Sequence, residues 1–92
     1  RTGLPAAIAL LNNYPNPFNP VTTIKYELPS EVRVSLEVFN LLGQQVATLV
    51  DELEPAGRYK ATFDASKVAS GLYLYRLKAG AFVETRKMLL MK

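Results

Sequence analysis

Residues 70–77, with the sequence Ser-Gly-Leu-Tyr-Leu-Tyr-Arg-Leu, constrain the fold more than any other stretch of this chain. In an extended backbone, successive side chains point to opposite faces of a sheet. Both faces would then carry aromatic or aliphatic side chains: Tyr73, Tyr75 and Leu77 on one, Leu72 and Leu74 on the other. This pattern predicts a strand with a neighbour on each side and cover above and below. Gly71 permits a tight entry into it.

Five further segments have the signature of strands, and a seventh strand is possible near residues 8–11. They are residues 22–28, 32–39, 44–53, 58–64 and 82–91. The clearest period-two alternation is that of residues 32–39, where valine and leucine alternate with polar side chains. Short turns separate the segments at roughly ten-residue intervals, which favours antiparallel pairing. We therefore predict an all-β fold, an immunoglobulin-like antiparallel β-sandwich of six to seven strands, with a small open barrel as second choice.

Three local patterns refine this prediction. Leu49 and Val50 interrupt the alternation of their segment, which indicates either burial on both sides or a β-bulge. Charged side chains on both faces of residues 82–91 are typical of an edge strand, where they discourage unwanted pairing. Residues 64–67 could form a single helical turn with Asp64 as its cap.

The chain is expected to form one domain with a short leading segment. Residues 1–11 are predicted to be a linker and a possible first strand, and residues 12–92 the β-sandwich domain. A signal peptide is less favoured, because the apolar run is short and has no clear cleavage site. Residues 12–20, which we call the connector, contain three prolines and should be stiff and non-helical. Tyr14 and Phe18 are predicted to anchor the connector to the core.

Composition argues against catalysis. The 92 residues include no histidine and no cysteine, so the usual general base, nucleophile–base pairs and soft metal ligands are missing. The five glycines are dispersed at predicted turns, and no glycine-rich phosphate loop is present. We expect neither an enzyme nor a protein that holds a cofactor or metal. No segment approaches the ~20 apolar residues that a membrane-spanning helix needs.

The formal charge of +3 is distributed unevenly. Residues 1–57 carry three basic and six acidic side chains, whereas residues 58–92 carry eight basic and two acidic ones. A basic half can steer a domain toward an acidic partner, although solvated strand positions explain the same pattern. No nucleic-acid-binding motif accompanies the charge, so no nucleic-acid partner is expected. Stacking of Tyr73 and Tyr75 on sugar rings, joined by Tyr26 and Tyr59, is a further alternative, but aromatic residues at strand spacing are more often core.

Several segments, in order, resemble a known family. They are residues 13–20 (Asn-Tyr-Pro-Asn-Pro-Phe-Asn-Pro), 22–24 (Thr-Thr-Ile), 38–46 (Val-Phe-Asn-Leu-Leu-Gly-Gln-Gln-Val), 63–66 (Phe-Asp-Ala-Ser), 69–77 (Ala-Ser-Gly-Leu-Tyr-Leu-Tyr-Arg-Leu) and 86–90 (Arg-Lys-Met-Leu-Leu). Together they are similar to the type A C-terminal sorting domains of the type IX secretion system, which is also called the Por secretion system. Hook-capping proteins carry a related immunoglobulin-like domain with a similar start. Their usual Trp-Asp-Gly-like segment is replaced here by residues 63–66, which favours the sorting domain.

The resemblance implies a domain at the C-terminus of a larger exported protein. Such domains are recognised by the type IX outer-membrane translocon and by associated cleavage and attachment proteins, after export through the periplasm, so the N-terminal cargo is secreted or held at the cell surface. A structural role of hook-cap type and a carbohydrate-binding accessory role stay open as alternatives. The residues that the resemblance assigns to partner recognition lie in the strand of residues 71–77 and in residues 86–92, the terminal segment. They are Gly71, Tyr73, Tyr75, Arg86, Lys87, Met88, Leu89, Leu90, Met91 and Lys92.

Overall fold

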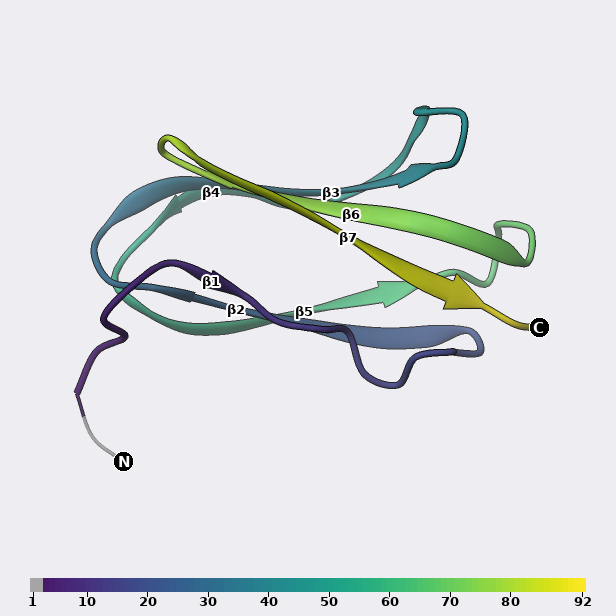
Figure 1. The fold of residues 1–92 in the computed structure, drawn as a ribbon, viewed down its shortest axis with the longest axis horizontal. Coiled ribbons are helices and arrows are strands. Elements are labelled where there is room, and N and C mark those ends of the chain that lie inside the picture. Colours follow the sequence, from purple (N-terminus) through teal and green to yellow (C-terminus); the bar gives the residue numbers. More distant parts are fainter. Residues whose placement is uncertain (1–2) are drawn as a thin grey trace.

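The computed structural model describes residues 3–92, which form two stacked antiparallel sheets (Figure 1). One sheet has the strand order β1-β2-β5 and the other the order β4-β3-β6-β7. The strands are β1 (Ala9–Leu10), β2 (Val21–Leu28), β3 (Val32–Asn40), β4 (Gln45–Glu54), β5 (Gly57–Asp64), β6 (Gly71–Ala79) and β7 (Phe82–Leu90). No helix occurs among residues 3–92. The predicted β-sandwich is therefore confirmed with seven strands, and the possible strand near residues 8–11 is the two-residue β1.

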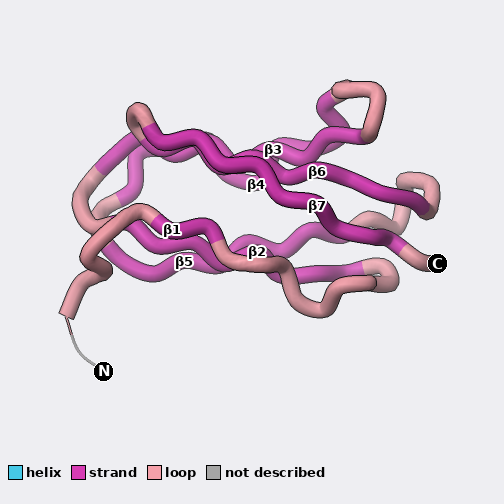
Figure 2. The backbone as a smooth tube through the Cα atoms, viewed as in Figure 1, coloured by secondary structure: helices cyan, strands magenta, loops and turns pink. Residues whose placement is uncertain are grey.

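The path of the chain between the sheets is that of an immunoglobulin-like sandwich. Short turns join β3 to β4 and β6 to β7 as hairpins within one sheet, and the chain crosses to the opposite sheet after β2, β4 and β5. The connector lies between β1 and β2 and brings the chain back along the same sheet (Figure 2). This arrangement places the connector, the β3–β4 turn and the C-terminus at one end of the molecule (Figures 1 and 2).

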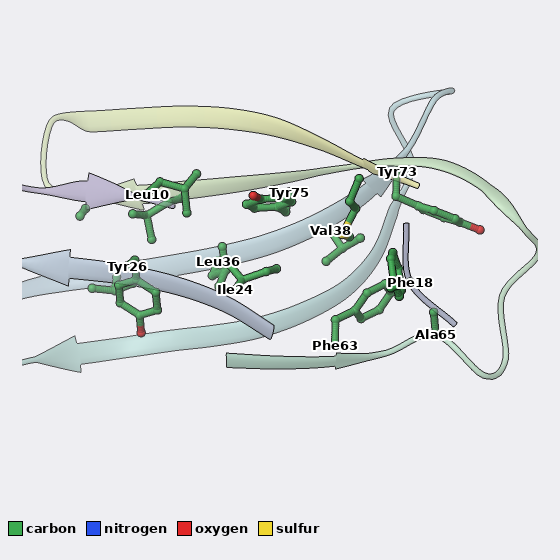
Figure 3. Packing of buried hydrophobic residues seen from close by; sticks show 14 of the residues in the cluster. Leu10, Phe18, Ile24, Tyr26, Leu36, Val38, Phe63, Ala65, Tyr73 and Tyr75 are labelled. Carbon is green, nitrogen blue, oxygen red and sulfur yellow. The ribbon is translucent and has the colours of Figure 1, made fainter. Parts of the chain in front are cut away.

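The core lies between the two sheets and is built by alternate side chains of the longer strands. Members of the cluster that are less than 2% exposed include Ile24, Tyr26, Leu28, Val34, Leu36, Val38, Tyr75, Leu77, Met88 and Leu90. Aromatic rings close its ends. Tyr26 is stacked on Tyr59 at a centroid distance of 5.3 Å. Phe18 is tilted against Phe63 at a centroid distance of 6.1 Å (Figure 3). The alternation that predicted β2 and β3 thus also identified their buried faces.

Strand β6 is central in its sheet, as predicted, because β3 and β7 pair with it on either side. Its inward face is buried, but its outward face is not, since Leu72 is 42% exposed. The prediction of cover on both faces is therefore wrong. The prediction of an edge position for β7 is confirmed, because β6 is its single partner strand in the described sheet.

Two further local predictions have different outcomes. In β4 the pairing with β3 shifts register around Leu49, which confirms the β-bulge. The expected helical turn after Asp64 is absent from the described residues, and a short turn takes its place. Its Ser66 amide donates to the Asp64 carboxylate at 3.0 Å, and the Val68 amide donates to the Ala65 carbonyl at 3.2 Å. The carboxylate caps this turn without starting a helix.

Candidate recognition surface

The two tyrosines of β6 that were assigned to recognition are buried. The Tyr73 side chain is 6% exposed, and its hydroxyl donates to the Ala69 carbonyl four residues upstream at 2.5 Å. This is the tyrosine corner of immunoglobulin-like sandwiches, which holds the loop before β6. Tyr75 is fully buried, so neither ring is available for stacking on a sugar. The suggested carbohydrate site at these two residues is therefore wrong.

Tyr75 joins the four-stranded sheet to the chain that precedes β2. Its hydroxyl donates to the Leu11 carbonyl at 2.9 Å and accepts the Asn13 amide at 3.0 Å. Burial raises the pKa of this phenol, which keeps it protonated and able to donate. The Asn13 side chain in turn donates to Thr22 Oγ1 at 3.0 Å. These bonds fix the start of the connector against the core.

The connector covers part of the free edge of β7. The Phe18 amide donates to the Leu89 carbonyl at 2.9 Å, and the Met91 amide donates to the Phe18 carbonyl at 3.0 Å. The Leu89 amide donates to the Asn16 side chain at 3.0 Å. Phe18 is 2% exposed, as an anchor should be, whereas Tyr14 is 80% exposed and its predicted anchoring role is wrong. Sequence reasoning did not predict this contact with the terminal segment. The only local indication of it was the presence of Asn16 and Phe18 between the prolines of the connector.

Within the terminal segment, alternate side chains have different environments. Met88 and Leu90 point into the core and are each 1% exposed, whereas Lys87 and Met91 are exposed. Leu89 is half-buried on the outward side. A partner of the folded domain can therefore contact Lys87 and Met91 directly, while Met88 and Leu90 hold the strand in place.

The two other charged residues of the terminal segment have partners within the domain. Arg86 forms an ion pair with Glu84 at 2.8 Å and donates to the Asn12 side chain at 2.8 Å. The Lys92 amide donates to Ser70 Oγ at 3.1 Å, and its ammonium donates to the Ser66 and Val68 carbonyls, the first at 2.9 Å. Lys92 remains exposed. The last residues are thus ordered by both the connector and the loop before β6.

The last residue of β5, Asp64, lies just before that loop and has a carboxylate with a lowered pKa. Hydrogen bonds from the hydroxyl and amide of Ser66 lower the pKa of Asp64, and the nearby ammonium groups of Lys67 and Lys92 lower it further. Asp64 is exposed and ionised, and its carboxylate accepts hydrogen bonds from the amide and the hydroxyl of Ser66. Its role is to cap the turn that holds Lys92.

One buried acid lies at the opposite end, between the sheets. Glu54 is 7% exposed and accepts a hydrogen bond of 2.6 Å from the Tyr26 hydroxyl. Burial raises the pKa of Glu54, and burial together with the bond to Glu54 raises the pKa of Tyr26. The stacked Tyr59 donates instead to the Pro55 carbonyl at 2.6 Å. The hydrogen bond between Tyr26 and Glu54 connects β2 to β4, and the stability that Glu54 contributes depends on pH.

Replacing Glu54 by Gln should remove a stabilisation that appears on acidification. Because the folded-state pKa is raised, the folded domain takes up a proton at pH values where the unfolded chain still has an ionised carboxylate. The free energy of unfolding of the unchanged domain therefore gains from this group as the pH falls through the raised pKa, and the gain is complete below the ordinary value of 4.5. We expect the free energy of unfolding, measured with urea across this pH range, to rise in the unchanged domain relative to Glu54→Gln as the pH falls.

The exposed Glu31 provides the control for this measurement. Glu31→Gln makes the same substitution at an exposed position, without removing a buried carboxylic acid. The lowered pKa of Asp64 acts in the opposite direction, but it is common to all three proteins and cancels in the differences. If the free energy of unfolding of Glu54→Gln changes with pH in parallel with that of the unchanged domain, the prediction is contradicted.

The described residues hold no group of three or more acidic side chains suited to a metal ion. They also form no helix, and therefore none that could cross a membrane. The fold and its contacts define a small β-sandwich with an ordered, partly accessible terminal strand. The chain belongs to the family of secretion system C-terminal sorting domains, whose model matches residues 12–91. No curated protein and no solved structure matched the chain.

Membership of this family carries a coarse function. The domain is a C-terminal sorting signal of the type IX secretion system, and proteins that carry it are exported to the cell surface or secreted. The family is one of sorting signals and is not a known enzyme family. Recognition by the ten residues named from the sequence stays a prediction. The contacts above divide those residues into buried ones that shape the strands and accessible ones that a partner can meet.

Proposed function

We propose that this domain targets a larger exported protein, joined to its N-terminal side, to the type IX translocation machinery of the outer membrane. Associated cleavage and attachment proteins then release the cargo or fix it at the cell surface. The observation that carries this proposal is the family match over residues 12–91. The ordered end that contains the terminal segment supports it, because a preorganised surface loses little conformational entropy on binding.

Within this proposal, the accessible side chains of the terminal segment make the contact. Lys87, Met91 and Lys92 are exposed, and Arg86 is partly exposed beside them. Tyr73, Tyr75, Met88 and Leu90 act indirectly by holding the strands in position. Gly71 contributes through its backbone, because its φ of 146° at the start of β6 disfavours any other residue.

The export of a reporter tests the proposal. Residues 1–92 are fused to the C-terminus of a periplasmic reporter in a host with this pathway, and the exported fraction is measured. We expect the unchanged fusion to leave the cell. A triple variant, Lys87→Glu, Met91→Asp and Lys92→Glu, should lower export about tenfold, which corresponds to ~1.4 kcal/mol of lost binding. Deleting the whole terminal segment is a weaker test, because it also removes Met88 and Leu90 from the core.

A matched variant on the other sheet separates recognition from general effects of charge. Val21→Asp, Lys25→Glu and Lys60→Glu change the same types of exposed side chain on β2 and β5. This control should be exported like the unchanged fusion. If the unchanged fusion stays in the periplasm, the sorting function is contradicted and a structural role of hook-cap type is favoured. If both triple variants are exported normally, the assignment of the terminal segment is contradicted.

A further inference from the structure

The outward face of the four-stranded sheet is divided into a charged half and an apolar half. In the charged half, Arg33 pairs with Asp51 at 2.6 Å and Arg76 pairs with Glu37 at 3.2 Å. Both pairs join side chains of adjacent strands in the sheet. The apolar half lies toward the end of the molecule that contains the β3–β4 turn and the C-terminus (Figure 1). It begins at Phe39, whose ring lies 4.5 Å from the Arg76 guanidinium.

Six hydrophobic side chains from three strands and one turn make up this apolar half, which we call the outer apolar patch. They are Phe39, Leu41, Leu42, Leu72, Leu74 and Leu89. The register places Phe39 beside Leu74, and Leu72 beside Leu89. In the turn, Leu41 is 63% exposed and Leu42 is 85% exposed. The turn rises on the outward side of the sheet (Figure 1), and Leu41 and Leu42 are its two exposed apolar residues.

The side chains of the two turn leucines have no role in closing the turn. Asn40 and the residues after it close the turn, because the Gly43 amide donates to the Asn40 carbonyl at 3.0 Å and the Leu42 amide donates to the Asn40 side chain at 2.9 Å. Neither leucine side chain belongs to the core or packs against it. Polar residues would serve equally at these positions, and they are the usual choice. A contiguous exposed apolar patch on a small domain is typical of a surface that binds another protein.

The charge around the patch indicates the chemistry of its partner. Lys87 lies beside Leu74 in the pairing of β6 with β7, on the rim of the patch. It forms no ion pair with any described residue, whereas Arg76, over the Phe39 ring, is paired with Glu37. The unpaired charge on this rim is therefore the positive charge of Lys87, which favours a carboxylate on the partner and disfavours a second copy with the same lysine.

We infer that the outer apolar patch docks onto a protein surface with an apolar centre and acidic edges. This inference rests on the proposed function, because the expected partner is a component of the export machinery. It extends the recognition surface from Lys87 and Leu89 of the terminal segment to the outward side of β6 and to Leu41 and Leu42 of the β3–β4 turn. The partner would thus contact the β3–β4 turn and the outward side of β6 and β7 at the same end as residues 86–92.

Reporter export with single acidic substitutions tests the inference. Leu42→Glu and Leu72→Glu place a carboxylate in the patch, where it meets apolar atoms and acidic groups of the partner. We expect each to lower export about tenfold or more, equivalent to ~1.4 kcal/mol. Leu53→Glu is the matched control, because Leu53 is 58% exposed on β4 beside Arg33, in the charged half of the same sheet. It should be exported like the unchanged fusion.

The outcomes separate this inference from the proposed function. If the unchanged fusion is exported and both patch variants are exported equally well, the patch inference is overturned and the sorting function stands. Equal loss of export for Leu53→Glu also overturns it, since the effect is then not confined to the patch. Leu42 is so exposed that its substitution does not threaten folding, which protease resistance of the fusion checks. Sedimentation of the isolated domain completes the test: a dimer abolished by Leu42→Glu identifies a second copy as the occupant and overturns the acidic partner.

Discussion

Replacing Phe18 by Ala is expected to destabilise the domain more than any other change in the connector. Truncating a buried Phe costs about 3–5 kcal/mol, a large part of the ~5–15 kcal/mol that stabilises a typical domain. Phe18 is 2% exposed and packs on Phe63, and its backbone carries two hydrogen bonds to the end of β7. The variant should therefore lose core packing and loosen the terminal segment together. Urea unfolding of the two proteins measures the loss.

Tyr14 provides the matched control within the same connector. Its ring is 80% exposed, while its backbone exchanges hydrogen bonds with Thr23 that an Ala would keep. Tyr14→Ala should change the free energy of unfolding by no more than about 0.5 kcal/mol. Similar losses for the two variants would contradict the assignment of Phe18 as the anchor.

Hydrogen exchange extends this prediction to the terminal segment. The Met91 amide donates to the Phe18 carbonyl, and the Leu89 amide donates to Asn16 in the same connector. Phe18→Ala should accelerate the exchange of these two amides more than that of the amides of β3, a strand that lies between β4 and β6. Uniform acceleration across all strands would instead indicate global destabilisation alone. The measurement thus shows whether the connector holds the terminal segment specifically.

The sequence predicted the strands and most of their inward faces, because burial on one side of a sheet leaves a period-two pattern. Val34, Leu36 and Val38 show this directly, since polar residues separate them and all three are fully buried. The edge position of β7 was predictable for a related reason, as Glu84 and Arg86 lie on its inward-pointing side where a central strand would be apolar.

The pattern failed where both faces of a strand are apolar. On β6, Leu72 and Leu74 predicted a second covering layer, but they contribute to an exposed patch. A leucine that contacts a partner protein and a leucine that contacts the core have the same sequence signature. The tertiary arrangement alone distinguishes them, and for the same reason Leu41 and Leu42 drew no attention as turn residues.

Long-range hydrogen bonds were also beyond sequence reasoning. Two aromatic residues of the connector, Tyr14 and Phe18, looked equivalent in the sequence, but the path of the connector buries Phe18 and exposes Tyr14. Likewise, Tyr73 and Tyr75 were proposed to stack on sugars because they share a strand face, whereas their hydroxyls bond the backbone of Ala69, Leu11 and Asn13. The bonds of Tyr75 join residues more than sixty positions apart, and such a pairing leaves no local pattern in one sequence.

Tyr75 allows the contribution of such a bond to be measured. Tyr75→Ala should cost about 3–5 kcal/mol, because the fully buried ring lies in the centre of the core. Tyr75→Phe keeps the ring and removes the hydroxyl, which leaves the buried Asn13 amide without its acceptor at a cost of about 1–3 kcal/mol.

Leu72→Ala, at an exposed position of the same strand, is the control for these two variants and should be nearly neutral in urea unfolding. If Tyr75→Phe is as stable as the unchanged domain, the hydroxyl does not hold the connector. The order of stability should therefore be unchanged domain and Leu72→Ala first, Tyr75→Phe next and Tyr75→Ala last. Reporter export should follow a different order, because Leu72→Ala alters the outer apolar patch while Tyr75→Phe alters only what lies beneath it.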